Sequence, residues 1–197
     1  MKGVSVSLLC SAFLVLACQT APATALTPDA ADRTALRECE PAPDADCTNA
    51  DLRFANLAGK DLRGANFSGA DLTRADLRRA NLVGAKFDGA TAVAANFSQA
   101  YLAQSRMVDA NLTGASFESA RMAGIDFSGA LLLGADLSGA WANKSKFVGT
   151  RIHSADLQET KLSASTFEGA QMHGTKIRFA VFSGAYFKDC SGCPIDW

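Results

Sequence analysis

The side chains of this chain that could do metal, redox or crosslinking chemistry are six cysteines and two histidines. Four of the cysteines form two close pairs, Cys39 with Cys47 and Cys190 with Cys193. Four cysteines could bind zinc, but these pairs lie near opposite ends of a repetitive sequence, and an elongated chain cannot bring its two ends together. We therefore predict two disulfides, Cys39–Cys47 and Cys190–Cys193, with a redox-active Cys-x-x-Cys pair at 190–193 as the alternative.

The two histidines, His153 and His173, are separated by 20 residues. If 20 residues make one structural period, their rings should stack about 5 Å apart on one face. A weak divalent metal site is one interpretation of this pair. Coincidental stacking is the other, because no carboxylate shares their column. Serine is abundant, but none lies in a strand-to-helix elbow that would expose a nucleophile. We predict no catalytic residue, no metal and no cofactor.

A second series with the same spacing combines aromatic and cationic side chains. Its members are Tyr101, Arg121, Trp141 and Lys161. An exposed stripe in which rings alternate with cations could bind a sugar polymer, a peptide or an anionic surface. The other interpretation is a ladder of cation–π contacts that only stabilises the molecule.

These spacings derive from a five-residue repeat between residues 50 and 189. Its 28 units are centred on residues 52, 57, 62 and so on to 187; the centre is Leu, Phe, Met or Ile in 26 units, and the residue two before it is Ala in 20. Alternate residues of an extended chain point the same way, so both positions face one interior. The chain must turn after each unit, and the Gly, Asp and Asn at other positions suit tight turns. Ala92 and Ala142 occupy two centres, where we expect a thinner core.

Units such as Ala65-Asn66-Phe67 and Ala70-Asp71-Leu72 resemble the motif of the pentapeptide-repeat family, a small residue, then Asp or Asn, then Leu or Phe. The resemblance implies an all-β fold, a right-handed quadrilateral β-helix solenoid of about seven four-sided coils with four units per coil. Centres 20 residues apart then form columns, and one column should be an aromatic ladder inside the core. Its members are Phe67, Phe87, Met107, Phe127, Phe147, Phe167 and Phe187.

Shorter segments flank the repeats. Residues 1–25 are predicted to be a signal peptide, because their apolar run is shorter than the roughly 20 residues of a membrane span and small residues follow it. The alternative is a lipoprotein signal that ends before Cys18, which would then carry the lipid. We predict an N-terminal cap over 26–49, with a short helix starting at Thr27, and a C-terminal cap over 190–197. The protein should be exported, to the periplasm or the exterior, or be an outer-membrane lipoprotein.

Some pentapeptide-repeat proteins mimic DNA and bind topoisomerases, a role that needs an acidic rod. Residues 50–189 carry 16 Lys and Arg against 13 Asp and Glu, a net charge of +3, so this is the weakest hypothesis, and we expect no nucleic acid partner. The first hypothesis is a non-enzymatic scaffold, a monomer or weak dimer, that binds a protein or cell-envelope component through one face. The alternative is a carbohydrate- or surface-binding module that uses Tyr101 and Trp141. Membrane contact is expected only through a lipid anchor at Cys18.

Overall fold

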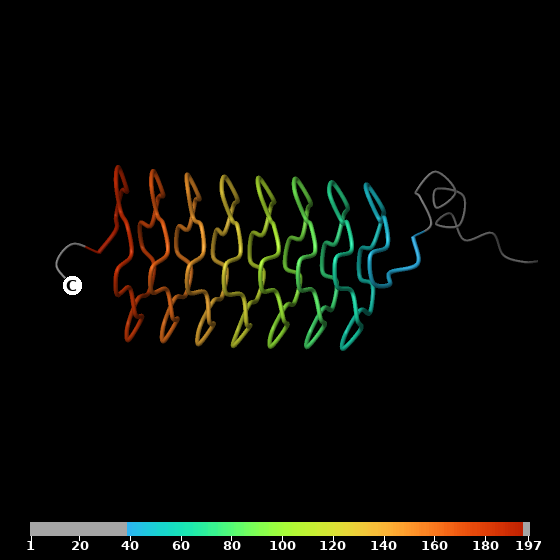
Figure 1. The fold of residues 1–197 in the computed structure, drawn as a ribbon. Helices are drawn as coiled ribbons and strands as arrows, with labels where there is room; N and C mark the ends of the chain where they lie inside the picture. The colour runs from blue at the N-terminus through green and yellow to red at the C-terminus, as the bar shows by residue number, and fades with distance from the viewer. Residues whose placement is uncertain (1–38, 195–197) are drawn as a thin grey trace, which may run out of the picture. The chain divides into compact units, whose positions relative to one another are not determined.

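Parallel bridges between residues 20 positions apart build the described part of the fold. The computed structural model describes residues 39–194. In this part of the chain, every fifth residue from Asp46 to Gln171 forms a parallel β-bridge with the residue 20 positions later, the last being Gln171↔Ser191. Four five-residue units therefore complete one coil, and the coils stack along a single axis (Figure 1).

No regular helix or extended strand occurs between residues 39 and 194. Each side of a coil has only one bridging residue before the chain turns, which is too short for a conventional strand. The described residues accordingly include no helix that is long and apolar enough to cross a membrane. The predicted signal peptide, the helix that would start at Thr27, and Cys18 all lie outside the described residues.

A tight turn follows every unit. In the turn at residues 52–55, the N–H of Ala55 donates to the carbonyl oxygen of Leu52 at 3.1 Å, and Phe54 has a φ of 59°. A positive φ at the third residue is the mark of a type II turn and explains why Gly is common there. The Asp or Asn before each centre also shapes the turn: Oδ1 of Asp71 accepts a hydrogen bond from the N–H of Thr73 at 2.9 Å. The predicted role of these residues in turns is confirmed.

Backbone hydrogen bonds join each coil to both neighbours. The N–H of Leu72 donates to the carbonyl oxygen of Thr91 at 2.6 Å, and the N–H of Thr91 donates to that of Ala70 at 2.9 Å. The same pair of bonds recurs along each side of the stack. The buried amides and carbonyls therefore find partners in the adjacent coil, which is how such short sides remain stable.

The predicted aromatic ladder lies in the core. Ring centroids are 5.0 Å apart for Phe67 and Phe87, and 4.7 Å apart for Phe147 and Phe167, with both pairs stacked. Phe67, Phe147 and Phe167 are fully buried. Met107 interrupts the column, and Phe187, in the last coil, is only partly buried. The inward direction of the repeat centres is therefore confirmed.

The sequence predicts an aromatic ladder on one side of the core, but the aromatic contacts also extend to another side. Phe97 and Phe117 stack on the opposite side with centroids 4.8 Å apart. Phe97 and Phe87 meet in a T-shaped contact with ring centroids 5.8 Å apart, and Phe117 and Phe127 do so with centroids 5.6 Å apart. The aromatic contacts therefore pass around Met107. Phe97 also lies one unit after the small centre Ala92, so this coil retains a bulky side chain beside the alanine.

Buried hydroxyl groups replace alanine at several inward positions in the C-terminal half. The Thr150 hydroxyl donates to the carbonyl oxygen of Phe127 at 2.7 Å, and that of Thr160 to Leu137 at 2.8 Å. Each bond joins residues 23 positions apart, in neighbouring coils. Side-chain hydrogen bonds therefore supplement the backbone bonds between coils here.

Both predicted cysteine pairs are joined in the structure. Cys39 and Cys47 form one disulfide, with their Cα atoms 5.2 Å apart, and Cys190 and Cys193 form the other, with Cα atoms 5.8 Å apart. Cys47 is buried at the core position in line with Phe67. The first disulfide therefore ties the segment before the repeats to the interior of the first coil.

Candidate binding face

One side of the solenoid carries the predicted aromatic and cationic stripe. We call it the Trp141 face, and it consists of the segments 81–84, 101–104, 121–124, 141–144, 161–164 and 181–184. The bridges Tyr101↔Arg121, Arg121↔Trp141 and Trp141↔Lys161 place these residues side by side in successive coils. Each precedes an inward-facing centre, so its own side chain points outward. The structure thus brings all four residues together.

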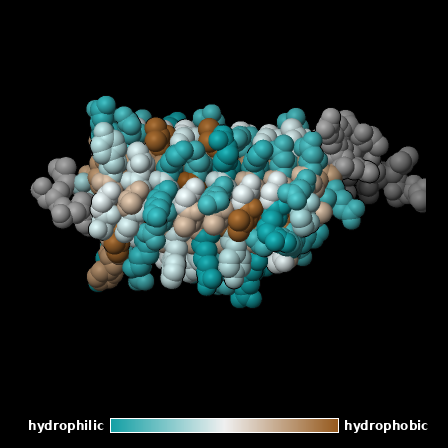
Figure 2. All heavy atoms as spheres, viewed as in Figure 1, coloured by the Kyte–Doolittle hydropathy of each residue, from teal (hydrophilic) through white to brown (hydrophobic). Residues whose placement is uncertain are grey.

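Two large rings on this face are open to solvent. Trp141 is 59% exposed and Tyr101 is 43% exposed. Exposed hydrophobic residues that stand alone are common, but two rings in line with two cations are a more specific arrangement. In the view of Figure 2, hydrophobic residues stand apart from one another among hydrophilic ones, so the surface seen there carries no broad apolar patch.

The two rings differ in their neighbours. The guanidinium carbon of Arg121 lies 5.3 Å from the centroid of the Tyr101 ring, a cation–π contact. Within residues 39–194, no such contact involves Trp141. The interpretation of the stripe as a stabilising ladder therefore fits only its Tyr101–Arg121 part, and Trp141 is the ring that remains open for a ligand.

Small side chains surround the stripe. The residues two positions after the stripe residues are Ala103, Ala123, Asn143 and Ser163. None of these can cover the neighbouring ring or cation. Oδ1 of Asn143 accepts a hydrogen bond from the N–H of Ser163 at 3.0 Å, so this amide is held against the next coil. All four stripe residues are exposed on this face.

The same side of the preceding coil carries an ion pair between Asp61 and Arg63, but on the Trp141 face itself the charge has one sign. Its segments from residue 81 to residue 184 contain Arg121, Lys144 and Lys161 and no Asp or Glu. The side that precedes it in each coil is mixed, with Asp76, Glu118, Asp136, Asp156 and Glu159 among its residues. Lys144 and the lack of carboxylates add to the predicted stripe. Both can be recognised in the sequence once the 20-residue columns are aligned.

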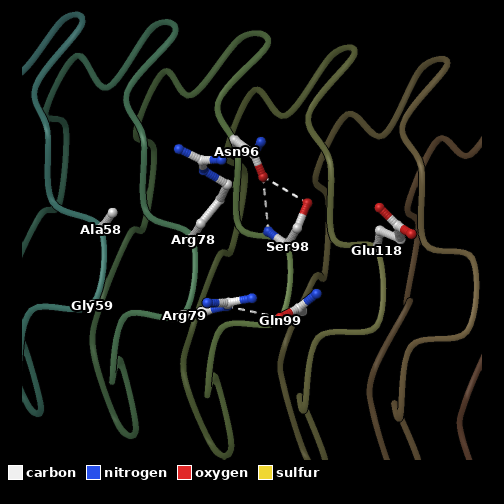
Figure 3. Close-up of a pocket in the computed structure, with 8 residues that line it drawn as sticks. All are labelled: Ala58, Gly59, Arg78, Arg79, Asn96, Ser98, Gln99 and Glu118. Carbon is white, nitrogen blue, oxygen red and sulfur yellow. Dashed lines mark hydrogen bonds between the residues drawn. The ribbon is translucent and has the colours of Figure 1, made fainter.

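A shallow groove of about 590 Å³ lies on that preceding side (Figure 3). Its lining residues are Ala58, Gly59, Arg78, Arg79, Asn96, Ser98, Gln99 and Glu118. The Arg78 guanidinium donates to both carboxylate oxygens of Asp76, at 2.8 and 2.6 Å, and lowers the pKa of that carboxyl. Nε of Arg79 donates to Oε1 of Gln99 at 2.9 Å. Both arginines are thus already engaged, and we assign no chemistry to the groove.

The histidine pair stacks as predicted. The rings of His153 and His173 have centroids 5.6 Å apart and an interplanar angle of 9°. Nε2 of His153 lies 3.1 Å from Oε1 of Gln171. Cys193 continues the same 20-residue column, but its sulfur is bonded to that of Cys190. No three His, Cys, Asp or Glu side chains gather into a metal site in the part of the chain that the structure describes.

The repeats identify the family. A model of pentapeptide repeats matches this chain over the overlapping ranges 45–82, 61–91, 80–118, 95–132, 110–149, 130–169 and 153–191. These ranges cover most of the sequence, and the chain belongs to the pentapeptide-repeat family. No curated protein matches it. Proteins of this family are generally structural or binding scaffolds and not enzymes.

Several solved structures are similar to this chain. A trypsin-treated form of QnrB1, a plasmid-mediated fluoroquinolone resistance protein, is 19% identical, with a TM-score of 0.58 and coverage of 80% of this chain and 78% of that one. HetL, a pentapeptide repeat protein involved in heterocyst differentiation regulation in the cyanobacterium Nostoc sp. strain PCC 7120, is 26% identical over 74% and 82% of the two chains, with a TM-score of 0.28. The family match and the likeness to QnrB1 imply a right-handed β-helix.

Proposed function

We propose that this protein is a non-enzymatic scaffold, a rigid rod of about seven coils that binds a protein or cell-envelope component through its Trp141 face. The observation that carries the proposal is the exposure of Trp141, 59%, in the middle of a face with three cations and no carboxylate. A stack of hydrogen-bonded coils is already ordered before it binds. It therefore loses little conformational entropy on association, which favours binding.

The packing of the coils supports a role in binding rather than catalysis. Side chains such as Leu62, Phe67 and Leu72 are completely buried and have no accessible surface. A reaction would therefore have to take place on the outer walls. Catalytic groups there would be open to water, which weakens the electrostatic interactions that catalysis depends on.

Export is part of the proposal. The apolar N-terminal run and the small residues after it support a secretory signal, with lipidation at Cys18 as the alternative. The two disulfides are consistent with an oxidising compartment such as the periplasm or the exterior. We propose that any contact with the membrane occurs through a lipid at Cys18, and that the rod is a monomer or weak dimer.

The role of a DNA mimic, suggested by the fold that is shared with QnrB1, is less well supported. A surface that imitates DNA must carry many negative charges, since the phosphate backbone dominates the recognition of DNA. Residues 50–189 have a net charge of +3, and the Trp141 face is cationic. The likeness to QnrB1 therefore extends to the fold only.

Affinity capture from cell-envelope extracts tests the proposal. The mature protein serves as bait beside two variants, Trp141→Ala and Tyr186→Ala. Tyr186 is the matched control, because it is 51% exposed and lies on a different side of the solenoid. Trp141→Ala should lose the captured component and Tyr186→Ala should retain it. Equal capture by both variants would show that the Trp141 face is not the binding surface.

A further inference from the structure

We propose that the ligand of the Trp141 face is an extended acidic polysaccharide that lies along the solenoid axis, with a negatively charged sugar at every second position. This inference rests on the proposed function and names the class of ligand for the same face. The spacing of the rings, the spacing of the cations and the absence of carboxylates from the face carry it.

The spacing of the coils matches that of sugars. Neighbouring coils are about 4.8 Å apart, the distance between paired strands. This is close to the length that one pyranose residue adds to an extended β-linked chain. Tyr101 and Trp141 are two coils apart, on the order of 10 Å. In such a chain each sugar is turned over relative to the previous one, so alternate sugars present the same face. Trp141, the open ring, is thus placed to stack on one sugar, and Tyr101 lies in register with the sugar two positions along the chain.

The cations have the same two-coil spacing and are offset from the rings by one coil. Arg121 lies between Tyr101 and Trp141, and Lys161 lies one coil beyond Trp141. A polymer with a carboxylate on every second sugar would therefore meet a ring and a cation alternately. The cation–π contact with Tyr101 holds the Arg121 guanidinium at the surface, where its planar group can pair with a carboxylate. Lys144, three positions after Trp141 on the same side of the coil, adds a third positive charge to the face.

Charge complementarity favours this ligand over the alternatives. A face with three cations and no Asp or Glu repels basic partners and attracts acidic ones. A neutral glycan would use the rings and leave the cations without a role. The core of a protein–protein interface is depleted of charged residues, whereas a cation, Arg121, lies between the two rings of this face. The small residues along the stripe leave room for a chain that runs from coil to coil.

Binding of a hyaluronan octasaccharide, in which a glucuronate alternates with an N-acetylglucosamine, tests the proposal by calorimetry on the mature protein. The comparison ligands are the same octasaccharide with reduced carboxyl groups and a neutral chitin oligosaccharide. We expect the acidic ligand to bind, Trp141→Ala to weaken binding by about tenfold or more, and Tyr186→Ala to leave it unchanged. Lys161→Gln should weaken binding and reduce its dependence on salt. Equal affinity for the carboxyl-reduced ligand would overturn the proposal.

A second measurement does not depend on the folding of the Trp141→Ala variant. The chain has two tryptophans, so Trp197→Phe leaves Trp141 as the only one. Its fluorescence should shift when the acidic octasaccharide binds, and should not respond to the chitin oligosaccharide. If neither calorimetry nor fluorescence detects the acidic ligand, the polysaccharide assignment is wrong. If an envelope protein is still captured through Trp141 in that case, the broader proposal of a binding face stands.

Discussion

The rings of Phe97 and Phe117 stack with their centroids 4.8 Å apart and an interplanar angle of 2°. They lie across the core from the main phenylalanine column and contact its members Phe87 and Phe127 edge to face. The pair therefore spans the gap that Met107 leaves in that column. Aromatic contacts are continuous through the middle of the solenoid because two sides of the core share them.

Replacement of Phe117 by alanine should destabilise the solenoid strongly. The ring is fully buried and contacts both Phe97 and Phe127, so its removal leaves a cavity with an expected cost of about 3–5 kcal/mol. Urea denaturation followed by circular dichroism measures the loss. Met107→Leu is the control, since a swap of similar volume should cost less than about 1.5 kcal/mol. A comparable loss for both variants would show that the aromatic link has no special role.

Removal of the Thr150 hydroxyl should weaken the contact between two coils. Thr150→Val keeps the shape of the side chain but removes the donor to the carbonyl oxygen of Phe127. That oxygen still accepts the N–H of Ala130 at 3.0 Å, so it remains partly satisfied and the expected loss is about 1 kcal/mol. Thr166→Val, at a half-buried position that faces outward, is the matched control and should change the free energy of unfolding little. No loss in Thr150→Val would mean that the hydroxyl contributes nothing.

Replacement of two neighbouring alanines by glycine should change the stability of the solenoid in opposite directions. Ala94 is exposed with a φ of 54°, in the left-handed region that favours glycine. Ala94→Gly relieves this strain, although the greater freedom of glycine in the unfolded chain offsets part of the gain. The free energy of unfolding should therefore rise by roughly 0.5–1 kcal/mol. Ala95 is buried and has no positive φ, so Ala95→Gly should destabilise by about 1 kcal/mol. Thermal unfolding of both variants checks the signs, and loss of stability in both would contradict the prediction.

The solenoid should become less stable at acidic pH, because Asp126 becomes protonated there. Burial by itself would raise the pKa of Asp126, but hydrogen bonds from Ser128 and the nearby charge of Lys146 lower it overall. A lowered pKa in the folded state adds stability above about pH 3.9, the ordinary value for Asp, and this contribution disappears as the pH falls through the lowered pKa.

Two variants test this pH dependence. In Asp126→Asn, the loss of stability between neutral and acidic pH should be smaller than in the parent protein. Ser128→Ala removes a hydroxyl donor, so the pKa of Asp126 should rise, which NMR titration of the carboxyl carbon can follow. An unchanged pKa in Ser128→Ala would show that this hydroxyl is not a cause of the shift.

Most of the architecture could be predicted from the five-residue period. The period determines which side chains point inward, so the burial of residues such as Phe67 and Leu72 follows from it directly. The same reasoning places Tyr101, Arg121 and Trp141 in one outward column. Gly, Asp and Asn mark the turns because those turns need a positive φ or a nearby acceptor for a backbone N–H.

Contacts between columns could not be predicted in this way. The edge contacts of Phe97 with Phe87 and of Phe117 with Phe127 depend on the width of the core and on the rotamers of the rings, which sequence spacing does not contain. The period likewise places Arg121 midway between Tyr101 and Trp141, with no preference for either ring. The tertiary structure places its guanidinium over Tyr101. A repeat in one dimension assigns each residue to a column, whereas packing in three dimensions decides which neighbours it contacts, and here it leaves Trp141 as the open ring.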